Sequence, residues 1–136
     1  MKLDNCIFCK IINGDIPSRR IYEDENFVVM MDVSPASKGH SLLLPKEHYA
    51  NMFEMPEELL AEVLKVAQKV AAKMMTALNA DGINILQNNG EAAGQTVFHY
   101  HMHLIPRYNG EEPMLTWEPK AYSADEMDAI KSSILK

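Results

Sequence analysis

Residues 98–105 alternate between histidine and bulky apolar side chains, with histidines at positions 99, 101 and 103. Side chains two residues apart point in different directions on an α-helix, whereas in a β-strand they emerge from the same face. A strand over this stretch would carry three imidazoles on one face. Its other face would carry Phe98, Tyr100, Met102 and Leu104. Because an imidazole can be a nucleophile, acid, base or metal ligand near neutral pH, we expect a strand that is half core and half functional site.

The composition is that of one compact domain, which we expect to span residues 1–136. With 136 residues and 47% hydrophobic side chains, the chain is long enough to bury a core. It has no run of about eighteen apolar residues and no signal-peptide pattern at its start, so we expect a soluble, cytoplasmic protein that does not bind membranes. A formal net charge of −6 and the lack of a Lys/Arg run argue against a nucleic-acid groove.

The first third of the chain predicts a short helix followed by a hairpin. Apolar residues recur at helical spacing over residues 6–13, and Gly14 is placed to cap the end of that helix. Two apolar runs, residues 19–22 and 27–31, are separated by turn residues and predict a β-hairpin. Residues 32–39 have the composition of a loop.

The middle of the chain predicts a strand, one long helix and a second strand. Residues 41–45 form a short apolar run that ends at proline, which indicates a buried strand. Pro56 suits the first turn of a helix, and the apolar side chains then recur in steps of three and four as far as Leu78. We expect Gly82 to end this helix in the left-handed conformation and residues 83–87 to form a strand.

A polar, glycine-bearing loop over residues 88–95 leads into the histidine strand. Pro106 and Pro113 are expected to bracket a second loop, and residues 116–119 to form an extended segment. Ser123 and Glu126 then make a capping box, which predicts a C-terminal helix over about residues 124–135. About five short strands and one long crossing helix indicate an α+β domain with an antiparallel sheet.

The alternating histidines resemble the signature of the histidine triad (HIT) family, and the resemblance covers most of the chain. It includes residues 6–12, 32–35, 39–40, 88–90 and 94–97 as well as the triad itself. The paired cysteines favour the nucleoside phosphoramidase, or Hint-like, branch. The resemblance implies a HIT-like fold and a nucleotide-binding protein that acts at the α-phosphorus through a covalent histidine intermediate. It also implies a homodimer in which two sheets join into one sheet of ten strands.

The resemblance assigns roles to individual residues of a nucleotide site. His101 matches the nucleophile, His103 a position that holds phosphoryl oxygens, and His40 a histidine beside the triad. The other matches are nucleotide-binding positions: Asp32 and Asn88 for the ribose and sugar-phosphate, Val33 for the base, and Gly94, Gln95 and Thr96 for the phosphate. Glycine also allows consecutive backbone amides to approach an anion, which supports the last assignment.

Cys6, Cys9, His48 and His99 form a second candidate site. Two thiolates at Cys-x-x-Cys spacing and two imidazoles would complete a tetrahedral zinc site, and four protein ligands would make the zinc structural. One branch of the family resembles this arrangement, with the first triad histidine as a ligand. In the alternative interpretation, Cys6 and Cys9 are reduced thiols that pack the first helix. A redox pair fits less well because the chain lacks the βαβ context of such motifs.

The resemblance implies a hydrolase that releases a small amine from a purine nucleoside 5′-phosphoramidate through nucleotidyl-His101. A hydrolase of dinucleoside polyphosphates of the Ap3A or Ap4A type is the alternative enzyme, and a non-catalytic nucleotide-binding or scaffolding protein is the alternative outside enzymes. A polyphosphate chain normally needs several charge-assisted donors, but no Lys/Arg cluster lies near the motifs, and the nearest candidate, Arg107, lies just past the triad strand behind Pro106. The first function is therefore favoured.

Overall fold

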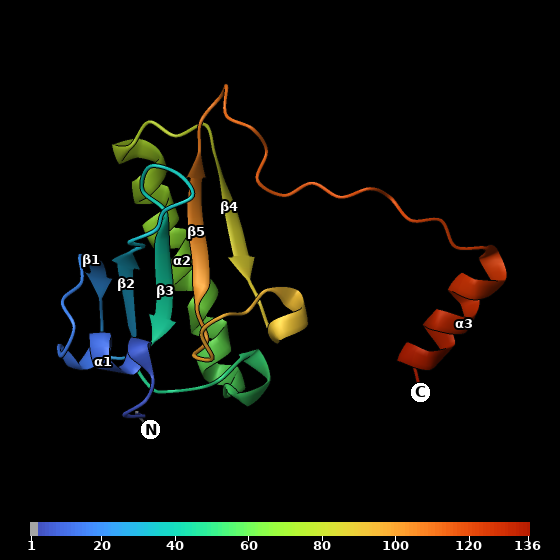
Figure 1. Ribbon diagram of the computed structural model, residues 1–136, viewed down its shortest axis with the longest axis horizontal. Coiled ribbons are helices and arrows are strands. Elements are labelled where there is room, and N and C mark those ends of the chain that lie inside the picture. Colours follow the sequence, from blue (N-terminus) through green and yellow to red (C-terminus); the bar gives the residue numbers. More distant parts are fainter. Residues whose placement is uncertain (1–2) are drawn as a thin grey trace.

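The computed structural model describes residues 3–136 and has an α+β fold built on one five-stranded antiparallel sheet, as predicted (Figure 1). The strands lie in the order β1-β2-β3-β5-β4, and each neighbouring pair is antiparallel. In chain order the elements are α1 (Ile7–Asn13), β1 (Arg20–Glu23), β2 (Phe27–Met31), β3 (Ser41–Pro45), the 3₁₀ turn η1 (Met52–Glu54), α2 (Glu57–Ala77), β4 (Gly82–Gln87), the 3₁₀ turn η2 (Glu91–Ala93), β5 (Met102–Arg107) and α3 (Ala124–Ile134).

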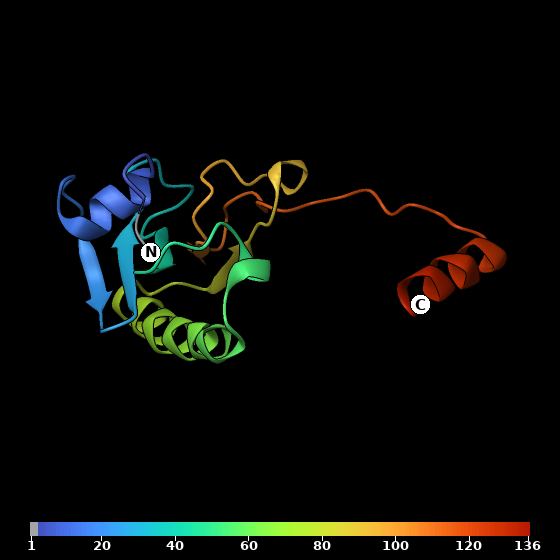
Figure 2. The same cartoon turned by 90° about the horizontal axis from the view of Figure 1, so that it is seen from below.

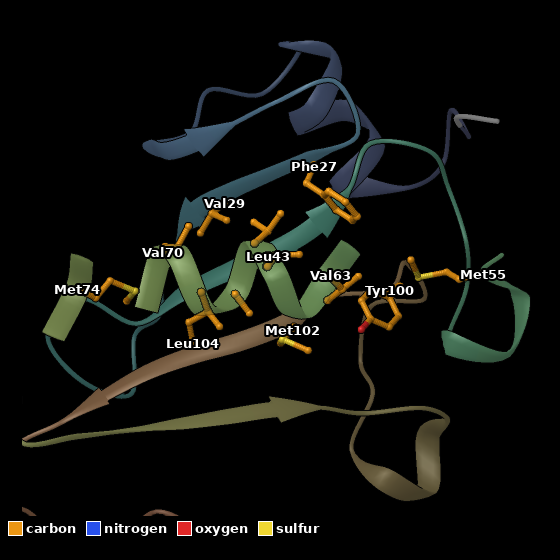
Figure 3. Packing of buried hydrophobic residues seen from close by; sticks show 12 residues of the cluster. Phe27, Val29, Leu43, Met55, Val63, Val70, Met74, Tyr100, Met102 and Leu104 are labelled. Carbon is orange, nitrogen blue, oxygen red and sulfur yellow. The ribbon is translucent and has the colours of Figure 1, made fainter. Parts of the chain in front are cut away.

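The sheet separates two apolar clusters, because side chains alternate between its faces. On one face Val29, Leu43 and Leu104 pack against Val63 and Val70 of α2 (Figure 3). On the opposite face α1 packs over the side chains that point the other way (Figure 2). These are Val28, Met30, Leu42 and Leu44. His103 is paired with Leu42 across β3 and β5, so it lies on the α1 face of the sheet.

The strand that carries the triad begins and ends later than the sequence indicated. We expected residues 98–105, but β5 is Met102–Arg107, so two of the three histidines precede it. The ladder with β3 begins only at Met102, and the Tyr100 N–H before it donates to the carbonyl of Tyr49 instead. Phe98 was expected in the core but is 50% exposed, because the chain bends over residues 97–99.

Pro106 lies inside β5 and does not begin a loop, which is a second correction. Pairing with β3 ends at Leu104, and the Pro106 carbonyl accepts a hydrogen bond from the Ser37 hydroxyl at 2.6 Å. The missing N–H of proline therefore costs no ladder hydrogen bond, which is the condition under which a strand tolerates proline. Pairing with β4 continues on the other side, where Pro106 faces Ile83.

The long helix is α2, and its end differs from the prediction. Pro56 is its N-cap, with Glu57 and Glu58 in the first turn, where the helix dipole favours negative charge. Asn79 takes the left-handed conformation with φ 52°, whereas Gly82, which we expected there, already starts β4. Asparagine is the non-glycine residue that tolerates this conformation best.

Beyond β5 the chain leaves the sheet as an extended segment and ends in α3 (Figures 1 and 2). The predicted capping box is present, since the Ser123 hydroxyl accepts from the Glu126 N–H and the Glu126 carboxylate accepts from the Ser123 N–H. In the described part of the chain, no helix has the length and apolar character needed to cross a membrane.

Candidate active site and metal-ligand cluster

His101 is buried and held in one tautomer by the backbone. Its Nδ1 lies 2.7 Å from the carbonyl oxygen of His99, which can only accept a hydrogen bond. Nδ1 therefore carries the proton, and the lone pair of a neutral His101 ring is on Nε2. Burial also lowers the pKa of His101, since it disfavours the charged ring. The residue thus presents an uncharged nitrogen with an available lone pair.

His40 and His103 form a hydrogen-bonded pair next to His101. The Ala36 N–H donates to Nδ1 of His40 at 2.9 Å, so a neutral His40 carries its proton on Nε2. His40 Nε2 lies 2.9 Å from Nδ1 of His103, and the donor must be His40. His103 in turn carries its proton on Nε2. The ring centres of His101 and His103 are 5.2 Å apart, so this N–H belongs to the same site.

Asp32 closes the group on its outer side. Its Oδ2 lies 3.5 Å from His40 Nε2, while Oδ1 accepts from the Ser34 N–H at 2.8 Å. Burial lowers the pKa of His40, and the negative charge of Asp32 opposes that shift. Burial lowers the pKa of His103 to about 4, and the neighbouring His101 and His40 add to the shift. The three imidazoles of His40, His101 and His103 are therefore uncharged near neutral pH.

A pH titration checks this electrostatic description. We expect the His103 imidazole to remain uncharged down to a pH of about 4. An unfolded histidine takes up its proton near pH 6.5, so the unfolded chain binds more protons between these values. The free energy of unfolding should therefore fall as the pH is lowered from 6.5 toward 4. NMR of isotopically labelled histidine side chains measures the pKa directly.

Two substitutions should move this pKa in opposite directions. His40→Asn removes a neighbouring imidazole that disfavours charge on His103, so the pKa should rise. Asp32→Asn removes a carboxylate that favours charge, so the pKa should fall. Shifts of the same sign in the two variants would contradict these electrostatic roles of His40 and Asp32. A wild-type His103 with a pKa near 6.5 would contradict the effect of burial.

In the loop that the sequence suggested for phosphate binding, two of the backbone amides already donate hydrogen bonds within the loop. The Gly94 N–H donates to the carbonyl of Glu91 at 2.9 Å, and the Gln95 N–H to that of Gly90 at 3.1 Å. Gln95 is 2% exposed, and its amide group holds the loop through the carbonyls of Ala50 and Val97 and the Gly90 N–H. Gln95 therefore has a structural role that its sequence context did not predict.

Thr96 and Asn88 remain available beside this loop. Thr96 is exposed just before the histidines. The Asn88 side chain lies against Gly94, since a Cβ at that glycine would be 3.5 Å from Asn88 Nδ2. Gly94 has a φ of 96°, which favours glycine. Asn88 follows Gln87, which pairs with Met102 of β5, and Thr96 precedes His99 by three residues.

A hollow of about 650 Å³ lies beside Asp32 and is lined by Val33, Pro35, Pro17, Ser18, Arg19 and Met31. Val33 is 90% exposed, so its side chain can cover a flat ligand. The sequence singled out Asp32 and Val33, but not the segment that includes Arg19. That segment reaches the hollow because the turn before β1 lies next to the loop after β2, a proximity that no local motif encodes.

The four predicted metal ligands come together around the first histidine of the triad. The His99 Nε2–H donates to the Pro45 carbonyl at 2.9 Å, which leaves Nδ1 to face the sulfur atoms. Nδ1 of His99 is 3.5 Å from Cys6 Sγ and 3.6 Å from Cys9 Sγ. Nδ1 of His48 is 3.4 Å from Cys9 Sγ. One ligand atom from each of the four residues lies within 4.8 Å of the others, so the group can hold a metal ion.

His99 and Phe8 connect the two clusters. The His99 ring faces the cysteines, while its backbone carbonyl orients His101. Phe8, which lies between the two cysteines in α1, packs edge-on against the rings of His99 and His101, with ring centres 5.9 and 5.0 Å apart. Burial lowers the pKa of His99 to about 4, so its ring is neutral, as a metal ligand must be. No pattern in the sequence indicated this contact.

The chain is similar to known proteins of one family. The model of the HIT domain family matches residues 13–110. The chain is similar to Protein hit of Bacillus subtilis (strain 168), with 46% identity over 136 residues, 98% of this chain and 94% of the relative. It is also similar to adenosine 5′-monophosphoramidase hnt1 of Schizosaccharomyces pombe, with 40% identity over 131 residues and 96% of each chain covered.

Solved structures extend the similarity to three dimensions. The crystal structure of a HIT family member from Bacillus subtilis has a TM-score of 0.89 at 44% identity and covers 97% of this chain and 96% of its own. A zinc-bound histidine triad family protein from Mycobacterium smegmatis has a TM-score of 0.77 at 39% identity and covers 96% of this chain and 94% of its own.

Proposed function

Because this chain belongs to the HIT domain family, we propose that it is a hydrolase that cleaves purine nucleoside 5′-phosphoramidates at the α-phosphorus through a nucleotidyl-histidine intermediate at His101. The Schizosaccharomyces pombe relative, whose name is adenosine 5′-monophosphoramidase, supports this substrate class. The observation that carries the proposal is the Nδ1–H of His101 bonded to the His99 carbonyl, which leaves Nε2 as a neutral nucleophile.

The reaction proceeds in two displacements at phosphorus. His101 Nε2 forms a bond to the α-phosphorus while the P–N bond to the leaving amine breaks and the amine takes up one proton. Water then attacks phosphorus and releases one proton to solvent, which balances the proton taken up by the amine, the bond to His101 breaks, and a nucleoside monophosphate leaves. The Nε2–H of His103 faces the same site and donates to a phosphoryl oxygen as its negative charge develops. His40 acts as a positioning residue, since it fixes the tautomer of His103.

The nucleoside is placed by the groups around the hollow and the loop. Asp32 accepts hydrogen bonds from the ribose hydroxyls, and Val33 covers one face of the base. Asn88 and the Thr96 hydroxyl contact the sugar-phosphate, since both lie on the loop beside the histidines. Gly94 and Gln95 stabilise the loop conformation through their own hydrogen bonds.

We also propose that the ion held by Cys6, Cys9, His48 and His99 is zinc. A tetrahedral zinc site with Zn–S near 2.3 Å and Zn–N near 2.0 Å separates sulfur and nitrogen ligands by about 3.5 Å. Three of the four sulfur–nitrogen pairs in the cluster are 3.4, 3.5 and 3.6 Å apart. Four protein donors leave no open position, so the ion is structural, and the zinc-bound relative supports its identity.

The cations near the site favour one phosphate over a polyphosphate chain. Arg107 is engaged elsewhere, because its guanidinium donates to the Glu112 carbonyl at 2.6 Å and lies 3.6 Å from Glu111. Arg19 is the cation among the residues that line the hollow beside Asp32. A tri- or tetraphosphate chain normally requires several charge-assisted donors. A monophosphate with an amine leaving group needs fewer cationic donors, so it fits the small number of cations near the site better.

A substrate comparison on one preparation tests the function. We expect adenosine or guanosine 5′-phosphoramidates to be hydrolysed with a kcat/KM at least about tenfold above that for diadenosine tri- or tetraphosphate. The product AMP or GMP should bind and inhibit. A preference for the dinucleotides would replace the proposed substrate class by dinucleoside polyphosphates. Binding of AMP without turnover of either class would indicate a nucleotide-binding protein that is not an enzyme.

A further inference from the structure

α3 carries an apolar stripe that is exposed to solvent in the single chain. Met127, Ile130 and Ile134 are three and four residues apart, so they share one face of the helix. They are 55%, 44% and 77% exposed. Trp117, in the segment that leads to α3, is also exposed. Exposed apolar side chains gathered on one helix face indicate a contact with another molecule.

α3 lies away from the domain in both views of the molecule. The connecting segment passes the β4 edge of the sheet, and α3 lies beyond it (Figures 1 and 2). The Bacillus subtilis structure matches 97% of this chain at a TM-score of 0.89, so the match includes the connecting segment and α3. The HIT domain model, in contrast, ends at residue 110. A helix held apart from its domain in two related proteins requires support from outside its own chain.

A largely apolar groove, which could accept the apolar stripe of α3, lies at the opposite edge of the sheet. It has a volume of about 270 Å³ between β1 and the second half of α2, and it is lined by Ile21, Tyr22, Met31, Val70, Met74 and Leu78. Two further lining residues, Lys69 and Lys73, are exposed and add positive charge. We refer to these eight residues as the β1–α2 groove.

We propose that the apolar stripe of α3 docks in the β1–α2 groove of a second copy of this chain. The occupant is a second copy because α3 lies past β4, whereas the groove lies at the β1 edge of the same sheet (Figure 1). The charges match, since the first turn of α3 carries Asp125 and Glu126 and the groove carries Lys69 and Lys73. Each copy offers one helix and one groove, so a reciprocal exchange closes a symmetric dimer. This contact goes beyond the proposed catalytic function and does not depend on it.

Site-directed cross-linking between two full-length chains tests the exchange. One chain carries Ile130→Cys and an affinity tag, and the other carries Ile21→Cys without a tag. Both positions are exposed in the single chain, at 44% and 46%, so neither substitution disturbs the core. After mixing, a short thiol-reactive cross-linker should join one tagged to one untagged chain. The native cysteines are buried, and wild-type chains treated in the same way measure their background.

The matched control moves the cysteine to the other side of the same helix. Ser132 lies about 160° around α3 from Ile130, so Ser132→Cys paired with Ile21→Cys should give at least about tenfold less cross-linked product. Equal yields from the two pairs, or no product above background, would overturn the proposal. A chain with both Ile21→Cys and Ile130→Cys that cross-links only within itself would also overturn it, since the helix would then occupy its own groove.

Discussion

Replacing His101 by Asn should abolish turnover while leaving the fold and nucleotide binding in place. The Asn side chain retains an N–H that can donate to the His99 carbonyl, the contact that holds His101 at 2.7 Å. It offers no nitrogen lone pair to phosphorus, so the covalent route is lost. We expect kcat/KM for a nucleoside phosphoramidate to fall on the order of 10⁴-fold or more. Steady-state kinetics and AMP binding by calorimetry measure the two effects separately.

Trapping of the intermediate distinguishes a nucleophile from a phosphate-binding histidine. Wild-type protein, denatured in base during turnover, should carry one nucleoside monophosphate on the peptide that contains His101. A His103→Asn variant provides the control. It loses a donor to the phosphoryl oxygen and should be slower, yet it should still give the adduct on His101. A His101→Asn variant that turns over at nearly the wild-type rate, or an adduct on another residue, would reject the proposed mechanism.

Local patterns in the sequence were sufficient for most of the fold. The turn residues between β1 and β2, the apolar period of α2 and the capping box of α3 each specify an element through short-range chemistry. The start of β5 is different, because it depends on where β3 stops pairing and on the Tyr49 carbonyl that takes the Tyr100 N–H. Pro106 depends in the same way on the point at which β3 ends. Strand boundaries follow from partners that are distant in sequence.

For the candidate site as well, the sequence predicted some features, while others depend on contacts between distant segments. The resemblance to the HIT family supplied the set of residues, and the structure brings the four predicted metal ligands together and the Asp32, His40 and His103 groups together. The tautomers were not predictable, since they rest on the His99 and Pro45 carbonyls and the Ala36 N–H. Nor was the burial of Gln95 or the approach of Arg19, because both require contacts between segments that no single motif contains.

The metal site should have the second large effect, on both stability and activity. Protein prepared without chelators should contain about one zinc per chain, and Cys9→Ser should lose it. Cys9 is fully buried, and α1 has only seven residues, too few to be stable as an isolated helix. Because binding of a structural zinc is coupled to folding, its loss should lower the melting temperature and release α1 from the sheet. Elemental analysis and thermal unfolding provide the two measurements.

A chelator separates metal binding from simple packing of the thiols. If the four residues hold zinc, a chelator should lower the melting temperature of the wild-type protein and leave that of Cys9→Ser unchanged. If Cys9 only packs α1, the chelator should change neither protein, and the substitution alone should be destabilising. Removal of the ion should also slow turnover, because the His99 ring is a ligand while its carbonyl holds His101. Full activity in metal-free protein would show that the backbone positions the nucleophile without help from the ion.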